Sequence, residues 1–216
     1  MDIEGNLRAY LGAREPSARY TSFDYCFNYF QEHRERNDLP ALLQGDGLPL
    51  SCLHLGFYLA SWGMLRGSSD LLRRSVRTFV PVIEAIANAP TEIWLTDANA
   101  YGDGSCPVVF ETAQQINAAL PNASDILVTK IMLGTFGCVP AFDTYFKKGF
   151  GSSTFGPKAL RRIGEFYNAN SEVIERNRVE TLDFASGLPT GRRYTRAKVI
   201  GDVIGAPMLA HKGSRE

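Results

Sequence analysis

Apolar residues recur at helical spacing along most of the chain, whereas strict alternation of apolar and polar residues is almost absent. In the segment 20–30, Phe23, Phe27 and Phe30 stand three or four positions apart, as on one face of a helix. We expect this aromatic face to belong to the core rather than to stack nucleobases. The overall pattern predicts an all-α fold, a compact bundle of roughly eight to ten helices with at most a short strand pair.

Residues 50–66 are apolar on nearly every side, which predicts a central buried helix. Residues 70–88 predict one long helix that Pro81 bends, because proline removes a backbone donor. Residues 93–95 are expected to form a short strand or the wall of a pocket, and 184–191 a turn-rich loop. Further helices are predicted at 107–119, 125–133, 171–182, from Pro157 onward, and from Thr195 to about residue 205.

The chain has 216 residues, of which 44% are apolar, enough for one core without disulfide bonds. Residues 1–19 are expected to be a loosely attached N-terminal arm, and 20–207 a single helical domain. The polar end, 208–216, predicts a disordered tail.

Charge is balanced overall, with 23 basic and 23 acidic residues, but it is uneven along the chain. Residues 1–142 hold 10 basic and 15 acidic groups, whereas 143–216 hold 13 and 8. The four cysteines are widely spaced and show no metal-ligand pattern. The N-terminus has no signal-peptide pattern, and no apolar run is long enough to cross a bilayer. A cytoplasmic, reduced setting is expected.

The segment 120–146 is the most informative part of the chain. It predicts a turn, a buried helix, a glycine-containing loop and an aspartate at the start of another helix. Lys130 stands among apolar residues of the buried helix, so it either extends to solvent or has a lowered pKa that makes it a nucleophile. Asp143 follows Pro140 closely, where its carboxylate is expected to cap the next helix.

This segment resembles the helix–hairpin–helix DNA glycosylases, most closely the branch that removes 8-oxoguanine. The resemblance is carried by Leu120-Pro121, the buried helix that follows, and Val139-Pro140-Ala141-Phe142-Asp143. In that family the hairpin amides hold a DNA phosphate, a lysine attacks the sugar, and the aspartate stabilises it. Here Asn122-Ala123-Ser124 stands where the family has glycines. Ile126 takes the usual lysine position, and Lys130 follows one turn later on the same face.

The resemblance implies that DNA is the partner, with Lys130 and Asp143 as the catalytic residues. The basic C-terminal third is then expected to face the phosphates. The candidate nucleic-acid-binding residues are Lys147, Lys148, Lys158, Arg161 and Arg162. No cofactor and no metal site is expected, because the calcium-like stretch 97–104 lacks the glutamate that would complete such a loop.

Two other classes of function stay open. One is a non-enzymatic helical adaptor whose aromatic faces serve the core and a protein partner. The other is a small-molecule-binding protein with a pocket around His54, Tyr58, Trp62 and Trp94. The oligomeric state does not follow from any of these patterns.

Overall fold

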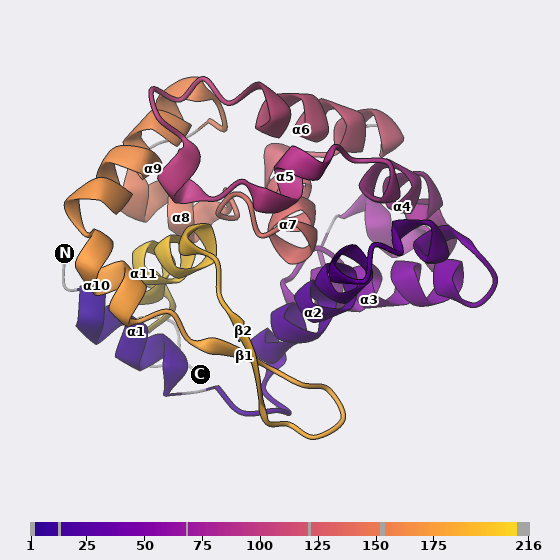
Figure 1. Ribbon diagram of the computed structural model, residues 1–216, viewed down its shortest axis with the longest axis horizontal. Coiled ribbons are helices and arrows are strands. Elements are labelled where there is room, and N and C mark those ends of the chain that lie inside the picture. The colour runs from indigo at the N-terminus through magenta and orange to yellow at the C-terminus, as the bar shows by residue number, and fades with distance from the viewer. Residues whose placement is uncertain (1–2, 13, 68, 121, 152–153, 211–216) are drawn as a thin grey trace.

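The computed structural model describes residues 3–12, 14–67, 69–120, 122–151 and 154–210 (Figure 1). Within these ranges the chain forms eleven α-helices, five short 3-10 helices and two strands. The α-helices are α1 (Ile3–Leu11), α2 (Ser22–Glu35), α3 (Gly47–Ser61), α4 (Val80–Ala87), α5 (Thr91–Leu95), α6 (Pro107–Ala119), α7 (Asp125–Thr135), α8 (Thr144–Phe150), α9 (Pro157–Ala169), α10 (Ser171–Arg176) and α11 (Arg196–Ala210). The 3-10 helices are η1 (Arg19–Thr21), η2 (Leu39–Leu43), η3 (Asp70–Arg73), η4 (Val76–Phe79) and η5 (Ala98–Ala100).

The two strands, β1 (Glu180–Leu182) and β2 (Pro189–Arg193), pair in an antiparallel hairpin. The prediction of an all-α fold with at most one short strand pair is therefore confirmed. The described residues hold one α-helix more than the upper end of the predicted range.

Helix α7 lies in the middle of the molecule and carries the predicted buried segment. Figure 1 shows α2, α3 and α4 on one side and α8 to α11 with α1 on the other, with α7 between them. Every residue of α7 from Leu127 to Thr135 is buried, and α7 contacts α2, α3 and α6. The helix begins where the Ser124 hydroxyl accepts a hydrogen bond from the Leu127 amide at 3.3 Å.

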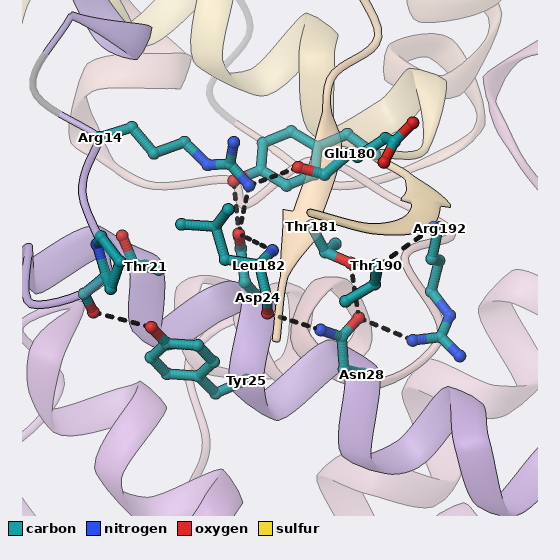
Figure 2. Close-up of polar contacts among 12 residues, drawn as sticks. Arg14, Thr21, Asp24, Tyr25, Asn28, Glu180, Thr181, Leu182, Thr190 and Arg192 are labelled. Atoms are coloured by element: carbon teal, nitrogen blue, oxygen red, sulfur yellow. Dashed lines mark hydrogen bonds and ion pairs between the residues drawn. The ribbon is translucent and has the colours of Figure 1, made fainter. Parts of the chain in front are cut away.

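Helix α2 contributes an aromatic face to the core, as the sequence predicted. Phe23, Phe27 and Phe30 are all buried. Two of the buried polar side chains of this helix, Asp24 and Asn28, bind the hairpin (Figure 2). They are satisfied by hydrogen bonds across the fold, so their burial is compensated.

The hairpin is attached to α2 by Asn28, which forms hydrogen bonds with Thr181, Leu182 and Arg192, and by Asp24. The Asp24 carboxylate accepts hydrogen bonds from the Leu182 amide at 2.8 Å and the Tyr194 hydroxyl at 2.5 Å. Arg14 forms an ion pair with the same carboxylate at 2.5 Å and also donates to the Glu180 carbonyl (Figure 2). Three segments far apart in sequence are therefore held at one buried carboxylate.

The N-terminal segment is attached to the domain and differs from the expected loose arm. Helix α1 packs along α11, and Leu7 is buried between them. Arg14 continues the attachment through its ion pair with Asp24. At the other end, the backbone of α11 continues to Ala210, beyond the predicted start of the tail, and 211–216 lie outside the described residues.

Several predicted elements differ in detail. The expected helix 70–88 is divided into η3, η4 and α4, because Pro81 sits in the first turn of α4, where it starts a helix instead of bending one. The segment 93–95 belongs to the short helix α5. The helix predicted for 171–182 ends at Arg176, and its last residues form β1.

Helix α3 is less buried than its apolar composition predicted. Leu50, Leu53 and Phe57 are 47%, 52% and 70% exposed. They repeat at positions i, i+3 and i+7, so one stripe of α3 faces outward while the opposite face packs on α2 and α7. An apolar helix is buried all round only where elements cover every face.

Candidate active site

A cavity of about 1050 Å³ opens between α7, α8, α11 and the segment that follows α3. Its wall includes both predicted catalytic residues, Lys130 from α7 and Asp143 from the start of α8. The turn before α7 lines the same cavity through residues Leu120 and 122–124. The three parts of segment 120–146 thus meet at one place, although Lys130 and Asp143 are separated by thirteen positions.

Lys130 reaches the cavity from within the core. Its Nζ donates a hydrogen bond to the Trp62 carbonyl at 2.7 Å and lies 3.8 Å from the Asp143 Oδ2. Burial lowers the pKa of Lys130, Asp143 opposes this shift, and the nearby cations Arg66 and Arg19 lower it further. The amine is therefore easier to deprotonate than an ordinary lysine while it still faces the cavity.

Asp143 both caps α8 and faces Lys130. Its Oδ1 accepts hydrogen bonds from the amides of Tyr145 and Phe146, both at 3.0 Å, and so caps α8 as predicted. Its Oδ2 is the atom that faces Lys130. The side chain is 24% exposed, so one oxygen holds the helix and the other stays available at the cavity.

The turn before α7 keeps its shape without glycine. Asn122 has a φ of 69°, the left-handed region that asparagine tolerates better than most residues. Ala123 then donates its amide to the Leu120 carbonyl at 3.0 Å, which closes the turn. Asn122 therefore supplies the backbone conformation that a glycine would otherwise provide. Pro121 lies outside the described residues.

Aromatic rings form one side of the cavity. Tyr20 and Trp62 both line it and meet edge to face, with ring centroids 5.4 Å apart. The Trp62 ring lies 5.9 Å from the Lys130 Nζ and 5.1 Å from the Lys198 Nζ. Its Nε1 is buried and has no hydrogen-bond partner within the described part of the chain. Trp62 is thus placed between two amines and beside open space.

A second amine–carboxylate pair lies behind this wall. Lys198 is fully buried and donates to both carboxylate oxygens of Asp202 at 2.6 Å, and Asp202 also lines the cavity. The rings of Phe23, Trp62 and Tyr194 surround the Lys198 ammonium. Burial raises the pKa of Asp202 to about 6, against the opposing charge of Lys198.

The predicted basic residues lie on α8 and α9, and none of them lines this cavity. Arg162 donates to the Phe150 carbonyl at 2.8 Å and so ties α9 to the end of α8, while Arg161 donates to the Asp103 carbonyl at 2.6 Å. Lys148 is exposed and lies one turn after Thr144, which does line the cavity. Lys147 is on α8 as well, and Lys158 is exposed on α9.

Three other arginines line the cavity, and the sequence patterns did not identify them as site residues. Arg19 comes from η1, Arg66 from the segment after α3, and Arg74 from the segment after η3. Arg19 lies 47 positions before Arg66, and the three stand in no recognisable motif, so only the fold brings Arg19 to the other two. The one local signal was Gly63 at the end of α3, because glycine there allows a tight turn.

The four residues predicted to form a small-molecule pocket do not share one cavity among the described residues. Trp62 lines the cavity above, whereas His54 lines a second, shallower one and stacks on Tyr29 at 4.1 Å. Tyr58 is fully buried, and Trp94 packs against Phe136, the residue after α7. Tyr58 and Trp94 therefore act as core residues.

No protein-family model, curated protein or solved structure matches this chain. Within the described ranges, no helix has both the length and the apolar character needed to cross a bilayer. No group of three or more His, Cys, Asp or Glu side chains in those ranges is arranged to hold a metal ion. The four cysteines are buried free thiols. The cavity geometry is therefore the basis for any functional proposal.

Proposed function

We propose that this protein is a DNA base-excision glycosylase in which Lys130 is the nucleophile and Asp143 stabilises charge on the sugar. The observation that carries the proposal is the 3.8 Å approach of the Lys130 Nζ and the Asp143 Oδ2 on the wall of one cavity. The turn at 122–124 on the same wall adds support, since the resemblance assigns that turn to a DNA phosphate.

In the proposed reaction the neutral Lys130 amine attacks the anomeric carbon of a damaged nucleotide. The new nitrogen–carbon bond forms as the glycosidic bond breaks, and the base leaves with the bonding electron pair and takes up the proton that the amine releases. The bond between the anomeric carbon and the ring oxygen then breaks, and the remaining proton on the Lys130 nitrogen moves to that oxygen, which gives an imine between Lys130 and the opened sugar. The Asp143 carboxylate faces the positive charge that develops at this carbon.

The cavity suits an extruded nucleotide in size and in lining. Its volume, about 1050 Å³, matches the upper range of small-molecule sites. Enzymes that act on a base remove it from the stack and hold it against aromatic or apolar side chains. Tyr20 and Trp62 offer such surfaces beside Lys130.

The experiment is borohydride trapping during reaction with a duplex that contains 8-oxoguanine, followed by peptide mapping. The imine should be reduced to a stable adduct at Lys130 that is lost in Lys130→Ala. Asp143→Asn keeps the capping oxygen but removes the charge, so the rate of adduct formation should fall by about 100-fold or more. Full activity in Asp143→Asn would show that the Asp143 carboxylate only caps α8 and has no part in the reaction. Absence of an adduct with 8-oxoguanine and with other base lesions would overturn the lysine mechanism.

A second candidate is a protein-interaction role, favoured by the exposed stripe of α3. Leu50, Leu53 and Phe57 line the shallower cavity together with Phe184 at the hairpin. Exposed apolar groups gathered on one surface are typical of interaction sites. Light scattering over a range of concentrations should show self-association that Phe57→Ser abolishes, if the partner is a second copy. A monomer at all concentrations would remove that form of the role.

A further inference from the structure

The cavity carries positive charge that its own carboxylates do not balance. Its lining contains four cations and three carboxylates, namely Arg19, Arg66, Arg74, Lys130, Asp70, Asp143 and Asp202. Each carboxylate already has a cation: Asp70 pairs with Arg74 at 2.6 Å, Asp143 with Lys130 at 3.8 Å, and Asp202 with Lys198 at 2.6 Å. Arg19 and Arg66 have no carboxylate within ion-pair distance among the described residues. These two guanidinium groups are the ones available to an anion.

Arg66 is folded back over the turn that ends α3. A Cβ on Gly63 would lie 2.8 Å from the Arg66 Nε and 2.9 Å from its guanidinium carbon. Gly63 also has a φ of 79°, so the turn requires glycine for its backbone, and the Arg66 side chain lies directly against it. Arg66 and Trp62 both line the cavity.

Arg19 binds the end of α3 at the same turn. Its Nε donates to the Ser61 carbonyl, and its guanidinium lies 5.3 Å from the Tyr20 ring centroid. Arg19 and Arg66 both act on the charge of Lys130, whose ammonium is held by the Trp62 carbonyl. Two guanidinium groups therefore contact residues 61 and 63, on either side of the tryptophan that holds the lysine.

We infer that Arg19 and Arg66 form a phosphate subsite, which takes a phosphate of the DNA strand next to the nucleotide held in the cavity. Guanidinium groups bind phosphate through paired hydrogen bonds, which gives both affinity and orientation. A phosphate at this point would place the attached sugar near the Lys130 amine. The inference rests on the proposed function for the identity of the ligand, and on the unpaired charges for its position.

The test is the salt dependence of binding, measured by fluorescence anisotropy with a labelled duplex that carries a non-cleavable abasic analogue. Each phosphate contact contributes about 0.9 to the slope of log affinity against log salt concentration. The double variant Arg19→Ala/Arg66→Ala should lower that slope by about 0.9. Arg19→Lys/Arg66→Lys should keep the slope but lower the affinity. Lysine keeps the positive charge but cannot form the paired hydrogen bonds of a guanidinium group. Arg73→Ala, an exposed arginine of η3 outside the cavity lining, is the matched control and should leave the slope unchanged.

The outcomes separate this inference from the proposed function. An unchanged slope in the double alanine variant, with trapping at Lys130 intact, overturns the phosphate subsite and leaves the glycosylase proposal standing. A lowered slope without any trapped adduct supports the subsite and overturns the glycosylase chemistry. Failure of the wild-type protein to bind DNA at low salt overturns both. Thermal unfolding of each variant should match the wild type, because both side chains lie at the surface of the cavity.

Discussion

The hydroxyl of Tyr58 donates a hydrogen bond of 3.1 Å to the main-chain carbonyl of Lys130. Its ring lies against Gly134, one turn further along α7, where a Cβ would stand 2.3 Å from a ring carbon. Helices α3 and α7 are thus fitted together at the turn that carries the candidate nucleophile. The position of Lys130 depends on a buried tyrosine and a glycine that have no chemistry of their own.

We expect Gly134→Ala to lower the free energy of unfolding by about 1–3 kcal/mol, because the added methyl group overpacks the core against Tyr58. Alanine has a higher helix propensity than glycine, so a net loss of stability can be assigned to the clash with Tyr58. Urea denaturation measures the change. The control is Gly201→Ala in the interior of α11, where an added Cβ would meet its nearest atom, the Pro140 Cβ, at an ordinary 3.5 Å, so the variant should be at least as stable as the wild type. Equal stabilities for the two variants would contradict the close fit.

The amine of Lys130 should titrate below the ordinary lysine value of 10.5, because burial disfavours its charged form. Arg66 lowers this pKa and Asp143 raises it, so the two neighbours have opposite effects. Arg66→Ala should therefore shift the midpoint to higher pH, and Asp143→Asn should shift it to lower pH. Competitive acylation of the amine over a pH series, read by mass spectrometry, measures the midpoint without requiring activity. Shifts in the same direction in both variants would show that the charges do not act on Lys130 directly.

The buried pair Lys198–Asp202 predicts a stability change between about pH 4 and about pH 6. Burial raises the pKa of Asp202 from 3.8 to about 6, with Asp24 adding to the shift and Lys198 and Arg14 opposing it. The folded state then binds more protons than the unfolded chain in this window, so this group's contribution to stability is present below 3.8 and is lost as the pH rises towards 6. Asp202→Asn should remove that component from urea-denaturation curves taken over the window.

The same substitution leaves the buried Lys198 without the Asp202 carboxylate and should cost about 3–5 kcal/mol. The matched control is the double variant Lys198→Met/Asp202→Leu, which removes both charges. It should recover most of the lost stability, because a buried ion pair is often no better than apolar residues of similar size. A double variant as unstable as Asp202→Asn would show that the ion pair contributes net stability to the fold, beyond each charge offsetting the burial cost of the other.

The sequence by itself determined the helical class, the aromatic face of α2 and the buried helix α7. These follow from local periodicity, which depends on residues three and four apart and needs no knowledge of the rest of the fold. The capping role of Asp143 was predictable for the same reason, since its partners are the amides of Tyr145 and Phe146. The apolar surroundings of Lys130 also marked it as a residue with unusual chemistry.

Only the tertiary structure decided what surrounds Lys130. The Trp62 carbonyl that accepts its hydrogen bond is 68 positions away, and Arg19 and Arg66 come from two further segments. Pairing over such distances is set by how the helices pack, which local periodicity does not encode. The same reason explains why α3, which is apolar on nearly every side, has one exposed stripe. The burial of a helix face depends on which other elements pack against it, and none of the described residues covers Leu50, Leu53 and Phe57.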